Sequence, residues 1–279
     1  MSSHTSKTTK VGKGGKAAKT VKTAKTVRTA KTVRTVKTDS SAPNLLGALT
    51  EFNIQVTKEK EDTKAVPVRD KMPKFFVELD KGLNVMMFPN ILDDAIAQKL
   101  FNALLKIEYR SDEESRVRIG GMWHVIPRKQ TAMGVSGTSY SFTGTNVSVD
   151  DWDKTYDDEN KTYAVEMIRF IASTLSDKFG KIFNYALINK YQNERNNIGY
   201  HSDDERELGD EPMILGLSLG QGRYMHFQHK ETKKVVKVFM PHNSLIVMAH
   251  PTNQKWKHSV PRATTPMGPR VSLTFRSVN

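Results

Sequence analysis

The chain of 279 residues contains no cysteine. Disulfides, zinc–thiolate sites and iron–sulfur clusters are therefore excluded, and a reducing intracellular compartment is expected. The chain also lacks any run of about 18 apolar residues, so we expect no membrane-spanning helix and no membrane contact.

Acidic residues are missing from residues 1–38, which hold 11 lysines and arginines. The formal net charge is +13, but the rest of the chain is nearly neutral, with 32 basic and 30 acidic residues. From Lys7 to Lys37 a base recurs at every third residue, which does not match the helical period of about 3.6. We predict a disordered basic tail over 1–40 that binds phosphates regardless of sequence; a merely solubilising tail is the alternative.

After the tail, residues 41–72 mix a short apolar stretch with charged residues and are predicted to form a linker. The folded domain is expected over 73–279, with its first strands at 75–79 and 85–88. A helix is predicted to begin at Asp93, where apolar residues start to recur at four-residue steps. A second helix is predicted over 163–179, ended by Gly180.

From residue 183 onward the sequence changes to short β-rich runs separated by Gly, Pro and Asn turns. Many short strands in succession indicate a β-sandwich or jelly roll. The expected strands are Phe183–Tyr191, Met213–Leu219, Tyr224–His229, Val235–Met240, Leu245–Met248 and Val271–Phe275.

The triplet His201-Ser202-Asp203 and the later His258 have the chemistry of an iron site. Two imidazoles and a carboxylate can occupy one face of an octahedral Fe(II) and leave the remaining positions open for a chelating co-substrate and O2. Residues i and i+2 of an extended strand point the same way, so His201 and Asp203 can reach one metal, with His258 arriving from a distant strand. Such a triplet alone is a weak indication.

One face of the last predicted strand carries Arg270, Ser272, Thr274 and Arg276. An ordinary edge strand with one solvent-exposed face would explain this pattern. A pocket wall would explain it equally, because two guanidinium groups can bind a dicarboxylate through forked hydrogen bonds.

Two more pairs have the i, i+2 spacing of residues on one face of a strand. Asn189 and Tyr191 could meet a carboxylate or belong to a hydrogen-bonded core. Tyr140 and Phe142 could stack on a flat base or could simply be core aromatic residues.

Taken together, these residues resemble the AlkB-type Fe(II)/2-oxoglutarate dioxygenases, and most closely the animal branch, AlkB homologs 2 and 3, that demethylates nucleic acids. The resemblance extends in order over roughly residues 75–278, and the tail lies outside it. It is carried by Asn189-Lys-Tyr191, Ile198 to Glu205, His250-Pro-Thr-Asn253, Trp256-Lys-His258, Pro269 to Arg276 and, upstream, Trp123-His124, Pro127 to Gln130 and Tyr140 to Gly144.

The resemblance implies a mainly β protein with flanking helices. A double-stranded β-helix (jelly-roll) core over 183–279 is expected, with buttress helices and a base-recognition lid over 73–182. It also implies Fe(II), with 2-oxoglutarate and O2 as co-substrates. It places Fe(II) at His201, Asp203 and His258, 2-oxoglutarate at Asn189, Tyr191, Arg270, Thr274 and Arg276, and the target base at Tyr140, Phe142 and Asp204.

Residues 119–123 depart from the pattern of that branch. Family members that act on duplex DNA are expected to carry a bulky wedge before the Gly-x-Trp of a β-hairpin, where this chain has Gly120. Ile119 or Met122 could substitute for the wedge. The loop 262–268 is also short of basic residues. Single-stranded DNA and RNA therefore stay open beside duplex DNA, and the tail could supply affinity.

The expected function is oxidative demethylation of N-alkylated bases in DNA, a direct-reversal repair. The alternatives are an RNA demethylase or other 2-oxoglutarate hydroxylase, and a non-catalytic nucleic-acid-binding module. We expect a monomeric intracellular protein that is nuclear or otherwise associated with DNA. Candidate nucleic-acid contacts are Gly120, Met122, Trp123, Arg128 and Lys129, although an isolated basic pair such as Arg128 and Lys129 more often lies on the surface without such a role.

Overall fold

The computed structural model describes residues 78–142 and 145–279. The basic tail, the linker and most of the strand expected at 75–79 lie outside the described residues. No helix in the described part of the chain is long and apolar enough to cross a membrane.

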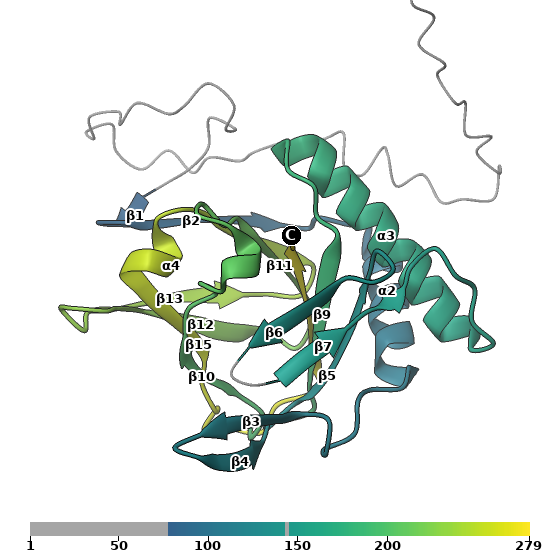
Figure 1. The fold of residues 1–279 in the computed structure, drawn as a ribbon, viewed down its shortest axis with the longest axis horizontal. Coiled ribbons are helices and arrows are strands. Elements are labelled where there is room, and N and C mark those ends of the chain that lie inside the picture. The colour runs from purple at the N-terminus through teal and green to yellow at the C-terminus, as the bar shows by residue number, and fades with distance from the viewer. Residues whose placement is uncertain (1–77, 143–144) are drawn as a thin grey trace, which may run out of the picture. The chain divides into compact units, whose positions relative to one another are not determined.

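Two β-sheets form the core of the described domain (Figure 1). The large sheet has eight strands in the order β1-β2-β14-β11-β16-β9-β5-β8, and the small sheet has four in the order β10-β15-β12-β13. Every pairing is antiparallel except that of β5 with β8. This arrangement agrees with the predicted jelly-roll class.

The strands of the large sheet are β1 (Glu78–Asp80), β2 (Leu83–Pro89), β5 (Lys129–Gly134), β8 (Asp150–Asp151), β9 (Tyr185–Tyr191), β11 (Ile214–Gly220), β14 (Ser244–Met248) and β16 (Arg270–Arg276). Those of the small sheet are β10 (Ile198–His201), β12 (Arg223–His229), β13 (Val235–Met240) and β15 (Trp256–Val260). Two hairpins stand apart from the sheets: β3 (Arg116–Ile119) with β4 (Met122–Val125), and β6 (Ser139–Phe142) with β7 (Thr145–Ser148).

Two long helices cover one face of the large sheet, α2 (Asp94–Lys106) and α3 (Glu159–Phe179). The Asp93 side chain caps α2 by accepting hydrogen bonds from two backbone N–H groups. Gly180 ends α3 in the left-handed conformation with φ 63°, as predicted. The short elements η1 (Arg206–Leu208) and α4 (Thr252–Lys255) lie in loops.

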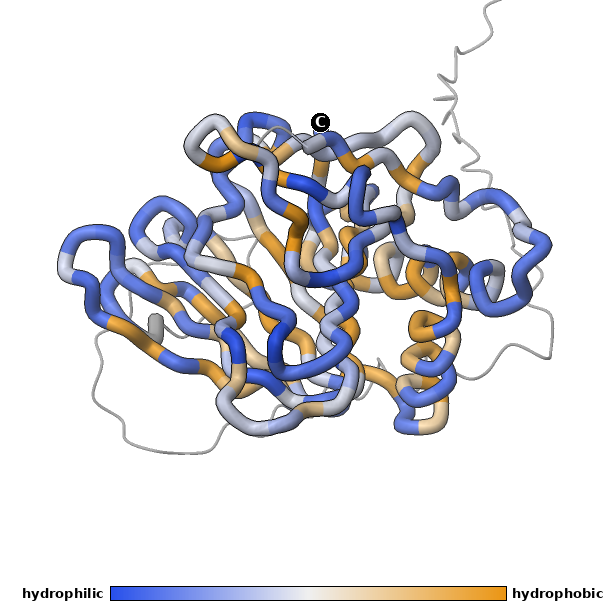
Figure 2. Tube along the Cα trace, turned by 90° about the horizontal axis from the view of Figure 1, so that it is seen from below, coloured by the Kyte–Doolittle hydropathy of each residue, from blue (hydrophilic) through white to orange (hydrophobic). Residues whose placement is uncertain are grey.

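The strands of the large sheet present alternate residues to two different apolar clusters. In β16, Val271, Leu273 and Phe275 pack against the cluster that includes α2 and α3. The opposite face of the sheet packs toward the small sheet, where Leu187 and Phe227 share a second cluster. Figure 2 shows hydrophobic segments running through the strands and helices, with hydrophilic ones in the outer loops. The polar face of β16 therefore points between the sheets.

The position of β16 decides between the two interpretations of its polar face. It lies inside the large sheet, between β11 and β9. Arg270 is 1% exposed and Arg276 is 4% exposed. The edge-strand interpretation is therefore wrong, and the strand forms an interior wall.

Candidate active site

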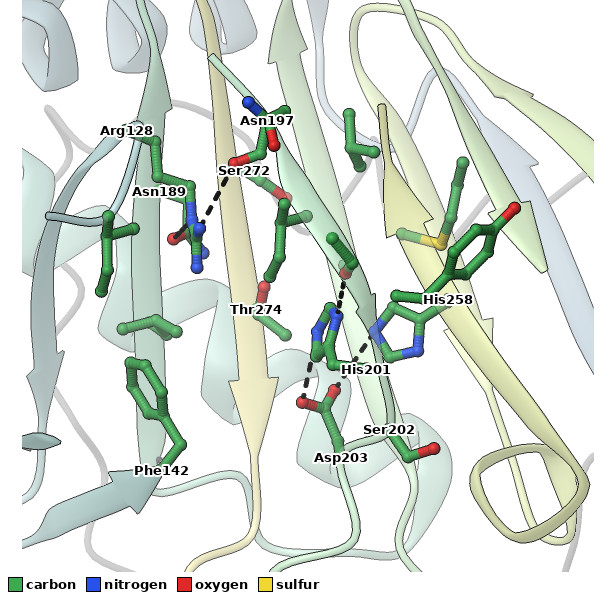
Figure 3. A pocket seen from close by; sticks show the side chains of 18 of the residues that line it. Arg128, Phe142, Asn189, Asn197, His201, Ser202, Asp203, His258, Ser272 and Thr274 are labelled. Carbon is green, nitrogen blue, oxygen red and sulfur yellow. Dashed lines mark hydrogen bonds and ion pairs between the residues drawn. The ribbon is translucent and has the colours of Figure 1, made fainter. Parts of the chain in front are cut away.

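Strand pairing brings the two histidines of the predicted iron site together. His201 ends β10, and His258 is its direct partner on the neighbouring β15. Their ring centroids are 4.2 Å apart. Asp203 follows in the loop after β10, so the two ligands do not share one strand as the spacing suggested. One potential ligand atom from each residue lies within 4.8 Å of the other two (Figure 3).

The protonation states of this group suit metal binding. Burial opposes ionisation of Asp203, but the charges of Arg276, His258 and His201 outweigh it and hold the pKa of Asp203 well below its usual range. Burial lowers the pKa of His258 to about 3 and also lowers the pKa of His201. Near neutral pH the group is therefore one carboxylate and two neutral imidazoles, the forms that coordinate metals.

The contacts of Asp203 leave one oxygen for a ligand. Its Oδ1 accepts a hydrogen bond of 3.0 Å from Arg276 Nη2, while the buried Oδ2 accepts none within the described chain. Oδ2 lies 3.7 Å from His258 Nε2, and Oδ1 lies 4.0 Å from His201 Nε2. Two ligand atoms of one ion are at most about 4.2 Å apart when each bond is about 2.1 Å. Both Asp203–histidine distances are within this limit, and one carboxylate with two neutral imidazoles is a donor set that fits a divalent metal such as Fe(II).

Arg270 and Arg276 supply buried donors on the same face of β16. Arg270 Nη2 donates to Ser218 Oγ at 2.7 Å and to Ser272 Oγ at 3.3 Å, and its guanidinium lies 5.1 Å from the centroid of the Tyr191 ring. In both arginines Nε and Nη1 are buried, and neither has a hydrogen-bond partner among the described residues. Buried N–H groups of a guanidinium that lack a hydrogen-bond partner are costly, so this wall is suited to binding an anion.

A cavity of about 460 Å³ opens between the two sheets, within the usual range for small-molecule sites. It brings together the residues predicted to bind metal, co-substrate and base. They are His201, Asp203 and His258; Asn189, Tyr191, Arg270, Thr274 and Arg276; and Tyr140, Phe142 and Asp204.

The three residues predicted to contact the base differ in their exposure. Tyr140 is 1% exposed, donates its hydroxyl hydrogen bond to Glu205 and lies under the Arg276 guanidinium at 4.7 Å. Its ring is thus covered, whereas Phe142, 5.8 Å away between centroids, is half-buried on the cavity wall. The Asp204 side chain is 62% exposed and lies 3.5 Å from Lys230 Nζ.

Glu205 also lines the cavity and was not singled out from the sequence. Burial raises its pKa, although the hydrogen bond from Tyr140 opposes that shift. It comes directly after two aspartates, a pattern typical of a solvated acidic turn. The hydrogen bond that holds Glu205 in the cavity wall comes from Tyr140, which lies far away in sequence. No local pattern around Glu205 could therefore predict its place in the site.

The candidate nucleic-acid contacts divide into exposed and buried residues. On the β3–β4 hairpin, Met122 is 65% exposed and Trp123 is 54% exposed, and a Cβ added at Gly120 would meet nothing within 4 Å. Lys129 is exposed and pairs with Asp112 at 2.6 Å.

Arg128 is buried, unlike a basic residue of the surface. It is 8% exposed, lines the cavity and donates from Nε to Asn189 Oδ1 at 2.8 Å. Its guanidinium therefore belongs to the interior wall.

Comparison with known proteins gives a consistent set of relatives. Residues 84–276 match the 2OG-Fe(II) oxygenase superfamily. The chain is 35% identical over 207 residues to DNA oxidative demethylase ALKBH2 of Bos taurus, covering 71% of this chain and 70% of that protein. It is 36% identical over 193 residues to its Homo sapiens counterpart, covering 66% and 69%. Identity to the Homo sapiens alpha-ketoglutarate-dependent dioxygenase alkB homolog 3 is 34% over 121 residues, covering 40% and 42%.

Proposed function

The chain belongs to the 2OG-Fe(II) oxygenase superfamily, and from that membership we propose that it removes N-linked methyl groups from nucleobases in DNA. Its relatives named DNA oxidative demethylase support the substrate class. The observation that carries the proposal is the His201, Asp203 and His258 group, which shares one cavity with two buried arginines that have unpaired donors. A non-catalytic module would have no physical need for either feature.

In this proposal each set of residues has a separate task. His201, Asp203 and His258 hold Fe(II), and Arg276 orients the carboxylate through the hydrogen bond to Asp203 Oδ1. Arg270 binds a carboxylate of 2-oxoglutarate with the N–H groups that have no protein partner among the described residues.

Asn189, Tyr191 and Thr274 complete the co-substrate site from the same inner face of the sheet. Asn189 and Tyr191 lie on β9, and Thr274 lies on the neighbouring β16. All three line the cavity.

The remaining residues act on the base. When bound, Fe(II) with 2-oxoglutarate and O2 hydroxylates the methyl group, and 2-oxoglutarate is converted to succinate and CO2. The hydroxymethyl group then leaves the base as formaldehyde. Phe142 supplies a face for stacking, Asp204 lies toward the polar edge of the base, and buried Tyr140 supports both Arg276 and Glu205.

The β3–β4 hairpin favours a substrate whose base is already unstacked. Its turn consists of Gly120 and Gly121, so no side chain at the tip can fill the gap left by a flipped base. Ile119, 57% exposed at the cavity, and Met122 can cover an unstacked base from the side. We therefore place single-stranded DNA ahead of duplex DNA, and RNA is the second candidate for the same reason.

The basic tail over 1–40 and the linker over 41–72 would then hold the domain near nucleic acid, in the nucleus or elsewhere on DNA. Eleven evenly spaced cations give a sequence-independent attraction to phosphates. This contribution would offset the scarcity of basic residues in the loop 262–268.

The test compares methylated single-stranded DNA, duplex DNA and RNA oligonucleotides, with formaldehyde and succinate measured together. We expect both products in equal amounts and fastest from single-stranded DNA. Asp203→Asn, which keeps the shape of the side chain, should abolish both products. Formaldehyde release that survives this change would refute the metal assignment, and no release from any of the three substrates would refute demethylation.

A further inference from the structure

The side-chain oxygen of Asn189 accepts two hydrogen bonds inside the cavity wall. Arg128 Nε donates to it at 2.8 Å (Figure 3), and Gln130 Nε2 donates at 2.7 Å. Gln130 faces Asn189 directly across the β5–β9 pairing. The three side chains are buried, with 6% exposure at Asn189, 8% at Arg128 and 1% at Gln130.

These donors decide which way the Asn189 amide points. A carbonyl oxygen has two lone pairs, and here both are used. A guanidinium has no acceptor, so the end of the amide that meets Arg128 must be the oxygen. The Nδ2 group then occupies the other end, and it donates to no residue in the described part of the chain. Asn189 lines the cavity, so its free donor is available to a ligand there.

We propose that Arg128 and Gln130 are positioning residues that hold Asn189 as a hydrogen-bond donor toward a carboxylate of 2-oxoglutarate. The proposal rests on the co-substrate site described under the proposed function. A flipped amide would turn its carbonyl oxygen toward the carboxylate and set its NH2 group against two other donors. The pair of donors from β5 excludes that orientation before the co-substrate arrives, which lowers the cost of ordering the site.

Gln130 is the cleaner residue for a test, because it does not line the cavity and reaches the co-substrate only through Asn189. Gln130→Glu is nearly isosteric and replaces the donor with an acceptor that attracts the Asn189 NH2 group. Gln130→Met removes the donor without adding charge, in case the carboxylate prevents folding. Thr131→Val is the matched control, since Thr131 is buried on the opposite face of the same strand and pairs with Ile188.

Binding of 2-oxoglutarate is measured by isothermal titration calorimetry on the full chain loaded with Mn2+, beside KM and kcat of the Fe(II) enzyme. Loss of one well-placed hydrogen bond corresponds to a rise in Kd of about tenfold. We expect that rise in Kd and KM for Gln130→Glu, a smaller rise for Gln130→Met, an unchanged kcat at saturating 2-oxoglutarate, and no change for Thr131→Val.

A double-mutant cycle separates positioning from general damage. In an Asn189→Ala background, Gln130→Glu should raise Kd no further. The proposal is overturned if both Gln130 variants bind like Thr131→Val, or if Gln130→Glu weakens binding equally without Asn189. A wild-type protein that binds no 2-oxoglutarate would instead overturn the co-substrate site itself.

Discussion

In the metal-free protein, Asp203→Ala should lower the free energy of unfolding far more than the loss of a surface ion pair does. Asp203 is 3% exposed, and its Oδ1 lies 3.0 Å from Arg276 Nη2, which belongs to a residue 4% exposed. Removing one partner of a buried pair leaves an uncompensated charge and costs about 3–5 kcal/mol. For a domain of this size that corresponds to a fall in Tm of roughly 6–20 °C. Asp203→Ala therefore tests stability as well as metal binding.

The assay is urea unfolding followed by tryptophan fluorescence, with EDTA present because a bound metal would stabilise the wild-type fold. Asp112→Ala is the control: its partner Lys129 lies 2.6 Å away, but both side chains are exposed, so the cost should be about 0.2–1 kcal/mol. Adding Arg276→Met to Asp203→Ala should recover part of the lost free energy of unfolding, because it removes the buried charge that no longer has a partner. If Asp203→Ala costs no more than Asp112→Ala, the reasoning is refuted.

Three further changes test other parts of the site. Arg270→Met should raise the Kd for 2-oxoglutarate by roughly 30-fold or more, because truncating a buried charged partner costs about 2–5 kcal/mol; calorimetry showing an unchanged Kd would contradict the arginine wall. Open space surrounds Gly120, so Gly120→Phe can place an aromatic side chain at the tip of the β3–β4 hairpin, at a cost of about 1–2 kcal/mol of stability for a side chain at φ +58°. The ratio of duplex to single-strand demethylation rates should then rise. A constant ratio would exclude this hairpin as a determinant of strand preference. Deleting residues 1–38 should weaken oligonucleotide binding and flatten its salt dependence without changing kcat, and equal salt slopes would show that the tail does not contact phosphates.

Local sequence signals predicted those helix boundaries that depend on neighbouring residues in the sequence. The helix starting after Asp93 was predicted from its cap and from apolar residues at four-residue steps, and α2 confirms it. Gly180 marked the end of α3 correctly, but the helix begins at Glu159, four residues before the predicted start. Asp158 caps that earlier turn, and the apolar pattern on which the prediction relied begins only later.

Strand β5 was not predicted, and it carries Gln130 and adjoins Arg128. Its sequence, Lys129 to Gly134, has neither alternation nor β-branched residues beyond Thr131. All its residues after Lys129 are buried, so no polar face marks it as a strand. The inward direction of Arg128 depends on Asn189, which lies 61 residues away in sequence. No local pattern contains that information.

The candidate metal and arginine residues were predicted from their chemistry, but their meeting in one cavity was not derivable from spacing. The arrangement depends on the order of strands in the sheets, which places β16 beside β9 and β10 beside β15. A strand expected to carry both His201 and Asp203 ends at His201 instead. The ligand group is completed by a loop, whose path is decided by contacts such as the one between Asp203 and Arg276.

The apolar core and the candidate site are formed by opposite faces of the same strands. A change in the pairing register of a strand would therefore disrupt both. In β16, Leu273 faces the helices while Arg270 and Arg276 face the cavity, and pairing with both β9 and β11 fixes this register. A shift of one residue would turn both arginines into the apolar layer under α3 and turn Leu273 into the site. Burying two unpaired guanidinium groups there would cost several kcal/mol each, which makes the shifted register inaccessible. The charges that we propose bind the co-substrate therefore also exclude the wrong pairing of the sheet that holds them.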